Sequence, residues 1–213
     1  MKARYLKEGL DSFEDHQVLE MLLFYAIPMK DTNELAHKMI GEFGSLSNLF
    51  EASPADISAR CQVSENIAIL VSLIPSLTRK YYQGKWGDKP VLDSSAKAGN
   101  FAVSLFAGRT LEVFFAICLD LNSKLTCASL VHEGTINEVA VYPRRIVEAA
   151  IRHHAVTVIL AHNHPGGTLK PSQADKQVTK MVKDALRGIA VNLADHIIVV
   201  GDKYYSFSEN DLI

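Results

Sequence analysis

The chain of 213 residues has few cysteines and no long apolar run. Its three cysteines, Cys61, Cys118 and Cys127, form no CxxC pair, so we expect neither a disulfide framework nor a zinc finger. The apolar runs at 21–27 and 156–161 are far too short to span a bilayer. The first residues turn polar at once and lack the apolar core of a signal peptide. These absences predict a cytoplasmic protein that does not enter a membrane.

The sequence also lacks an excess of basic residues. Its net charge is −2; residues 1–85 contain 9 Lys and Arg against 11 Asp and Glu, and residues 86–213 contain 13 of each. Proteins that bind nucleic acid without sequence specificity depend on a basic surface that releases counterions. Strong non-specific DNA binding is therefore disfavoured, and a local basic patch stays open.

The composition, with 48% hydrophobic and 22% charged residues, is that of a globular protein. Residues 1–83 predict a small all-α domain of the helix-hairpin-helix type, because apolar residues recur at helical spacing. Its helix ends are indicated by Pro28 and by Gly44 as a C-cap. Ser53 and Pro54 together predict the start of a further helix.

The last turn of this helical domain lacks a feature that DNA binding would require. A helix-hairpin-helix domain that binds DNA carries a Gly-x-Gly turn before its last helix, where backbone amides meet a phosphate. The corresponding residues 59–68 read ARCQVSENIA and contain no glycine. This absence argues against DNA binding by the first domain.

Residues 84–95 contain two glycines and a proline and predict a linker. After it, residues 96–213 predict an α/β sandwich, in which short apolar strands alternate with amphipathic helices. We expect strands at 111–121, 124–134, 156–161, 196–201 and 204–209, and helices at 144–154 and 171–188.

The stretch LAHNHPGGTLKPSQAD, residues 160–175, contains the strongest candidate site. Side chains alternate along a strand, so His162 and His164 are expected on one side. Ser172 and Asp175 follow at the start of the next helix, where a Ser-x-x-Asp pair is also typical of a capping box. Two imidazoles and a carboxylate would supply the three protein ligands of a catalytic zinc and leave the fourth position to water. A metal site and a plain loop with a helix cap are the two interpretations.

A zinc hydrolase would also need a proton acceptor, and residues 160–175 contain no glutamate. Glu112 is the best candidate, because a carboxylate at the entrance of the apolar strand 111–121 is costly without a purpose. The alternative interpretation of Glu112 is an exposed charge at the edge of a strand. Glu133 and Glu138 are weaker candidates. One of the adjacent Asp195 and His196 is expected to support the site from a second layer, because neighbours in a strand face opposite ways.

The spacing His162-x-His164-x7-Ser172-x2-Asp175 matches the JAMM (MPN+) metalloprotease motif. The strings AHNHPGG, PSQAD, LADHIIVV and SFSE, with the helical N-terminal part, make nearly the whole chain similar to the bacterial RadC-like proteins. This resemblance implies a JAMM- and cytidine-deaminase-like α/β sandwich preceded by a small all-α domain.

The resemblance further implies an enzyme, a zinc metallopeptidase that hydrolyses peptide or isopeptide bonds of a protein or peptide substrate. His162, His164 and Asp175 would be the zinc ligands, and zinc-bound water the nucleophile. Ser172 would stabilise an oxyanion, and Glu112 would be the general base.

Two other functions stay open on the sequence. The family's name and the helical first domain would suit a factor associated with DNA repair or recombination, against which the charge balance argues. A non-catalytic scaffold of the same fold is the other, against which the complete ligand set argues.

Overall fold

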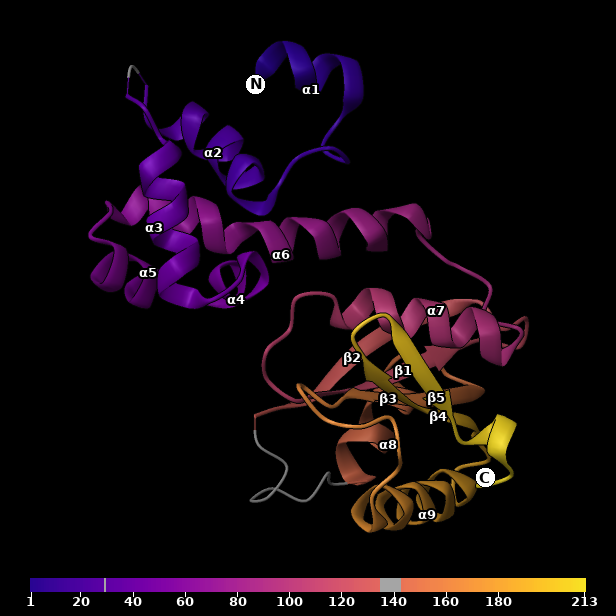
Figure 1. The fold of residues 1–213 in the computed structure, drawn as a ribbon. Helices are drawn as coiled ribbons and strands as arrows, with labels where there is room; N and C mark the ends of the chain where they lie inside the picture. Colours follow the sequence, from indigo (N-terminus) through magenta and orange to yellow (C-terminus); the bar gives the residue numbers. More distant parts are fainter. Residues whose placement is uncertain (29, 135–142) are drawn as a thin grey trace. The chain divides into compact units, whose positions relative to one another are not determined.

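A computed structural model gives the structure of this chain and describes residues 1–28, 30–134 and 143–213. The chain divides into two compact units, Met1–Leu77 and Thr78–Ile213 (Figure 1). Within the described residues, no helix has the length and apolar character that crossing a membrane requires.

The first unit is helical, as the sequence predicts. Its helices are α1 (Lys2–Glu8), α2 (Asp15–Ala26), α3 (Asn33–Phe43), α4 (Leu46–Glu51), α5 (Pro54–Cys61) and the first part of α6 (Glu65–Lys85). Gly44 ends α3 in the left-handed conformation with φ 82°, and the Ser53 hydroxyl accepts a hydrogen bond at the start of α5. After α5 the left-handed position is taken by Gln62, with φ 56°, and not by a glycine.

The core of the first unit consists of apolar side chains from α2 to α6. Leu19 and Leu23 of α2 are fully buried, which agrees with the helical spacing of the sequence. Met39, Leu49 and Ile57 bring one buried side chain each from α3, α4 and α5. These buried side chains hold α3, α4 and α5 in the unit, since isolated helices of this length are marginal in water.

The second unit is a five-stranded mixed sheet with helices on both faces, and its α/β class is the one that the sequence predicts. Its elements are α7 (Ser95–Phe106), β1 (Val113–Leu119), β2 (Leu125–Glu133), α8 (Pro143–Arg152), β3 (Thr157–Asn163), α9 (Gln173–Arg187), β4 (Asn192–Val200) and β5 (Lys203–Ser206), followed by the short 3-10 helix Ser208–Asn210. The strand order is β2-β1-β3-β4-β5, in which β3 and β4 are parallel and the other pairs antiparallel.

The two faces of the sheet carry separate apolar cores. Helix α7 covers one face, and α8 and α9 cover the other (Figure 1). Alternation along β1 sends Phe115 and Ile117 toward α7, and Phe114 and Ala116 toward α8 and α9. Every residue of β1 is buried, so its sequence reads as a continuous apolar run.

Candidate metal centre

His162 and His164 stand at the end of β3, on the face covered by α8 and α9. Their Nε2 atoms lie 2.9 Å apart, and the His162 side chain is fully buried. The strand ends at Asn163, and the chain then turns through Gly166, whose φ of 67° favours glycine. The central strand therefore directs both imidazoles to one point at its end.

Ser172 and Asp175 begin α9 and form a complete capping box. The Asp175 amide donates to the Ser172 hydroxyl at 3.0 Å, and the Ser172 amide donates to Asp175 Oδ2 at 2.7 Å. The other oxygen, Oδ1, lies 3.2 Å from Nε2 of His162, and Oδ2 lies 3.7 Å from Nε2 of His164. The Asp175 carboxylate therefore takes part in the capping box and also lies close to both histidines.

A chain of hydrogen bonds behind His162 fixes its tautomer. Thr179 Oγ1 lies 2.6 Å from the carbonyl oxygen of Asp175, which can only accept, so the single hydroxyl proton is donated there. The hydroxyl must then accept from Nδ1 of His196, at 2.7 Å. Nε2 of His196 is left to accept from Nδ1 of His162, at 2.8 Å. His162 therefore presents an unprotonated Nε2 to the site.

His164 is oriented by a simpler contact. Its Nδ1 lies 2.8 Å from the carbonyl oxygen of Thr168 and donates to it, which directs Nε2 toward His162 and Asp175. Two imidazole nitrogens and one carboxylate consequently converge at the end of β3.

Burial strengthens this arrangement. Burial lowers the pKa of His162, although the neighbouring Asp175 opposes the shift, and burial lowers the pKa of His196 well below its usual range. For Asp175, burial acts to raise the pKa, but the interaction with His162 and the hydrogen bond from the Ser172 amide outweigh it and hold the pKa below its usual range. An ionised carboxylate beside two converging imidazole nitrogens is a donor set that suits a cation.

The donor set fits zinc. Zinc prefers nitrogen and oxygen ligands in a tetrahedral arrangement with Zn–N bonds near 2.0 Å, which places two ligand nitrogens roughly 3.3 Å apart. The observed 2.9 Å between the two Nε2 atoms differs from this by a few tenths of an ångström. A small rotation of the less buried His164 ring would accommodate the ion.

Aromatic rings enclose the histidines on the buried side. Phe114 stacks on His162 with ring centroids 5.4 Å apart and an interplanar angle of 8°, and Phe207 stacks on His196 at 4.7 Å. These contacts restrict the imidazole rotamers and keep water away from the rear of the site.

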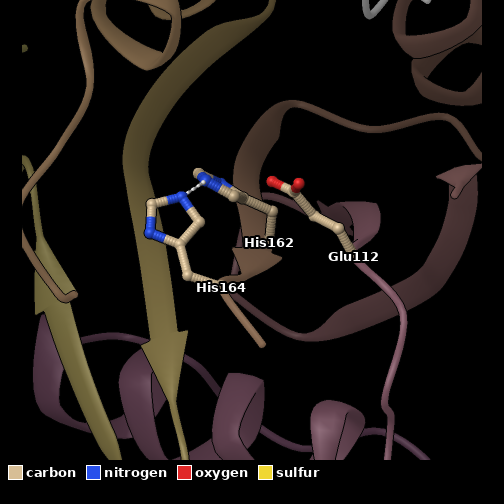
Figure 2. Close-up of side chains that lie close together, drawn as sticks. All are labelled: Glu112, His162 and His164. Atoms are coloured by element: carbon tan, nitrogen blue, oxygen red, sulfur yellow. Dashed lines mark hydrogen bonds between the residues drawn. The ribbon is translucent and has the colours of Figure 1, made fainter. Parts of the chain in front are cut away.

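Glu112 lies directly before β1 and is half-buried. One ligand atom from each of Glu112, His162 and His164 lies within 4.8 Å of the others. Figure 2 shows the carboxylate of Glu112 directed toward the two imidazoles. Fifty residues separate Glu112 from His162 in the sequence, and the antiparallel pairing of β1 with β3 brings them together.

The other candidate residues differ in where they lie. Glu133, the last residue of β2, forms an ion pair with Arg109 at 3.4 Å, and Glu138 falls outside the described residues. Asp195 accepts hydrogen bonds from Ser206 and from the amide of His196, whereas the side chain of His196 contacts His162 and supports the site.

Sequence reasoning missed two contributors. Thr179 lies four residues after Asp175, so the two share a helix face, and that spacing was the available signal. Asn163 lies between the two histidines, and strand alternation directs its side chain away from them. Its amide in fact contacts the backbone on either side of Glu112, which no local pattern indicates.

Comparison with known proteins agrees with this geometry. Residues 92–212 match the model of the RadC-like JAB domain family. The chain is 32% identical to a UPF0758 protein of Pseudoalteromonas translucida over 212 residues, which cover 100% of this chain and 95% of the relative. It is 33% identical to a UPF0758 protein of Burkholderia thailandensis over 209 residues, covering 98% of this chain and 79% of that relative. These names state no activity.

Proposed function

Because the chain belongs to the RadC-like JAB domain family, which has a metalloprotease-like fold, we propose that it is a zinc-dependent hydrolase of peptide or isopeptide bonds. In this proposal His162, His164 and Asp175 hold the zinc ion, Glu112 is the general base and Ser172 assists the oxyanion. The substrate is a protein or peptide.

One observation carries the proposal. Two imidazole nitrogens and a carboxylate converge at the end of β3, and a second carboxylate, that of Glu112, lies beside them. A purely structural zinc site would use a fourth protein ligand and exclude water. Three tightly held ligands beside a less buried carboxylate suit an open, catalytic site better.

Asp175 and Glu112 are assigned different roles for a physical reason. Asp175 is buried, and its carboxylate is fixed by the capping box with Oδ1 3.2 Å from His162. Glu112 is half-buried and comes from a different strand end, so it remains accessible to water and substrate. A fixed carboxylate suits a ligand, and an accessible one suits proton transfer.

When bound, zinc supplies Lewis acidity that polarises a carbonyl group and acidifies water. Glu112 then accepts the proton of the attacking water and delivers it to the departing amine. The Ser172 hydroxyl accepts from the Asp175 amide and keeps its own proton, which it can donate to the oxygen that becomes negatively charged.

The first experiment is elemental mass spectrometry of the purified, zinc-loaded full chain beside His162→Ala and Asp175→Ala. We expect about one zinc per chain in the wild type and its loss in both variants. A wild type that binds no zinc would refute the hydrolase.

The second experiment tests catalysis. A quenched-fluorescence peptide library and peptides joined through a lysine ε-amine would be incubated with the wild type and with Glu112→Gln. We expect cleavage that the isosteric Gln variant loses while it retains its zinc. Zinc binding without cleavage of any of these peptides would favour the non-catalytic scaffold.

A further inference from the structure

Asn163 makes two hydrogen bonds that bracket Glu112. Its Oδ1 accepts from the Val113 amide at 2.8 Å, and its Nδ2 donates to the Leu111 carbonyl at 3.0 Å. The Asn163 side chain is buried, with 5% exposure. One carboxamide thus contacts the backbone immediately before and immediately after the candidate base.

The two Asn163 hydrogen bonds link the β1 and β3 segments beyond the last residue pair of the sheet. The antiparallel register of β1 with β3 ends at the pair Phe114 and His162, so Glu112 lies beyond the last paired residue. On the other side, the Gly134 amide donates to the Glu112 carbonyl at 2.9 Å. Without the Asn163 side chain, the segment that carries Glu112 would lose two hydrogen bonds to β3.

The sequence neighbours of Asn163 explain why this attachment matters. Alternation at the end of β3 directs His162 and His164 to one side and Asn163 to the other. The same three residues therefore present both imidazoles and hold the backbone of Glu112. The separation between the imidazoles and the carboxylate is set within one rigid strand end.

We propose that Asn163 is a positioning residue that fixes Glu112 relative to His162 and His164. The inference rests on the proposed function, in which Glu112 transfers protons. A misplacement of about 1 Å in such a site can lower the rate about 100-fold. The carboxamide is required because a single group must accept from one amide and donate to one carbonyl.

The direct test compares crystal structures of the zinc-loaded full chain as wild type, Asn163→Ala and Asn163→Asp. We expect the Glu112 carboxylate to shift by about 1 Å or more in Asn163→Ala while both imidazoles stay in place. Asn163→Asp keeps the acceptor for Val113 but loses the donor to Leu111, so an intermediate shift is expected. The Asn163→Asp variant still tests the proposal if Asn163→Ala does not fold. An unmoved Glu112 in the variants would overturn the proposal.

Kinetics on a cleaved library peptide give a second readout. We expect kcat to fall about 100-fold in Asn163→Ala with KM changed only a few-fold. Adding Asn163→Ala to Glu112→Gln should produce no further loss, because Asn163 acts through Glu112. Fully additive losses would contradict this.

The matched control is Ser104→Ala, which removes a buried hydroxyl bonded to the Phe101 carbonyl in α7, on the opposite face of the sheet. It should leave kcat and the position of Glu112 unchanged. If the wild type cleaves no peptide, the proposed hydrolase fails, and the position of Glu112 still decides the role of Asn163.

Discussion

The two units of this chain bury different kinds of side chain. In the described part of the first unit, Thr32 is the single buried polar residue, and the rest of the buried core is apolar. Among its described residues, the second unit buries eight that are polar or charged: Ser104, His162, Asn163, Asp175, Thr179, Asp195, His196 and Ser206.

Buried polar groups are costly to desolvate, so their placement is informative. Four of the eight, His162, Asp175, Thr179 and His196, form the histidine and aspartate cluster with its hydrogen-bond partners. A fifth, Asn163, lies between the two histidines and contacts the backbone on either side of Glu112. The first unit carries no comparable cluster among its described residues. The comparison teaches that the candidate metal centre belongs to the second unit, whereas the buried side chains described in the first unit form an almost wholly apolar core.

A truncation in the core of the first unit should give the largest effect, and it tests the comparison between the two units. Leu23→Ala in α2 should destabilise the first unit by about 2–5 kcal/mol, because it removes a fully buried side chain and leaves a cavity. Zinc content should stay at that of the wild type. Denaturant unfolding followed by hydrogen exchange, with elemental analysis, measures both.

Its matched control is Leu160→Ala in β3, two residues before His162 and also fully buried. This variant should lose similar stability and also weaken zinc binding. Equal loss of zinc in Leu23→Ala would break the distinction between the units.

Zinc loading should stabilise the second unit and leave the first unit unchanged. At zinc concentrations about 100-fold above Kd, binding to the native state adds about 2.7 kcal/mol of stability. We expect slower hydrogen exchange in β3 and the first turn of α9, and unchanged exchange in α2 to α5. Exchange measured before and after chelation checks this, and protection spread evenly over both units would contradict it.

The hydrogen-bonded chain behind His162 gives the next effect. His196→Ala leaves Nδ1 of His162 without its partner, and loss of such a support typically costs 10–100-fold in metal affinity. Competition with a chromogenic chelator measures the affinity. Thr179→Val keeps the imidazole of His196 and should weaken zinc binding less. If both variants bind zinc as tightly as the wild type, His196 and Thr179 do not support His162 as a ligand.

The sequence predicted the parts of this site that are local. His162, His164, Ser172 and Asp175 lie within fourteen positions, so strand alternation and helix capping suffice to group them. Glu112 was identified through an anomaly, a carboxylate at the entrance of an apolar strand. Its proximity to the histidines depends on the β1–β3 pairing.

What the sequence did not predict depends on contacts between distant segments. Helix α7 was missed, because Gly99 in its middle is a poor helix former. In the structure a Cβ at Gly99 would meet the ring of Tyr204 at 2.5 Å, so only glycine allows α7 to pack there. The contact of Asn163 with Leu111 and Val113 likewise spans about fifty residues.

The smallest effect compares two capping serines, one in each unit. Ser53 accepts from the Asp56 amide at 3.1 Å, and Ser172 accepts from the Asp175 amide at 3.0 Å. Either Ser→Ala substitution removes an N-cap, which costs about 1 kcal/mol of stability. Thermal unfolding of the two variants should therefore give similar losses.

Zinc affinity separates the two serines, because the cap of α9 also orients a carboxylate. Ser172→Ala frees the Asp175 backbone from its cap, so Oδ1 loses its fixed place beside His162 and zinc binding weakens. Ser172→Thr retains a hydroxyl cap and should restore the affinity, whereas Ser53→Ala should leave it unchanged. If Ser172→Ala loses stability but no zinc affinity, the serine acts as a cap alone, and the metal centre holds Asp175 without its help.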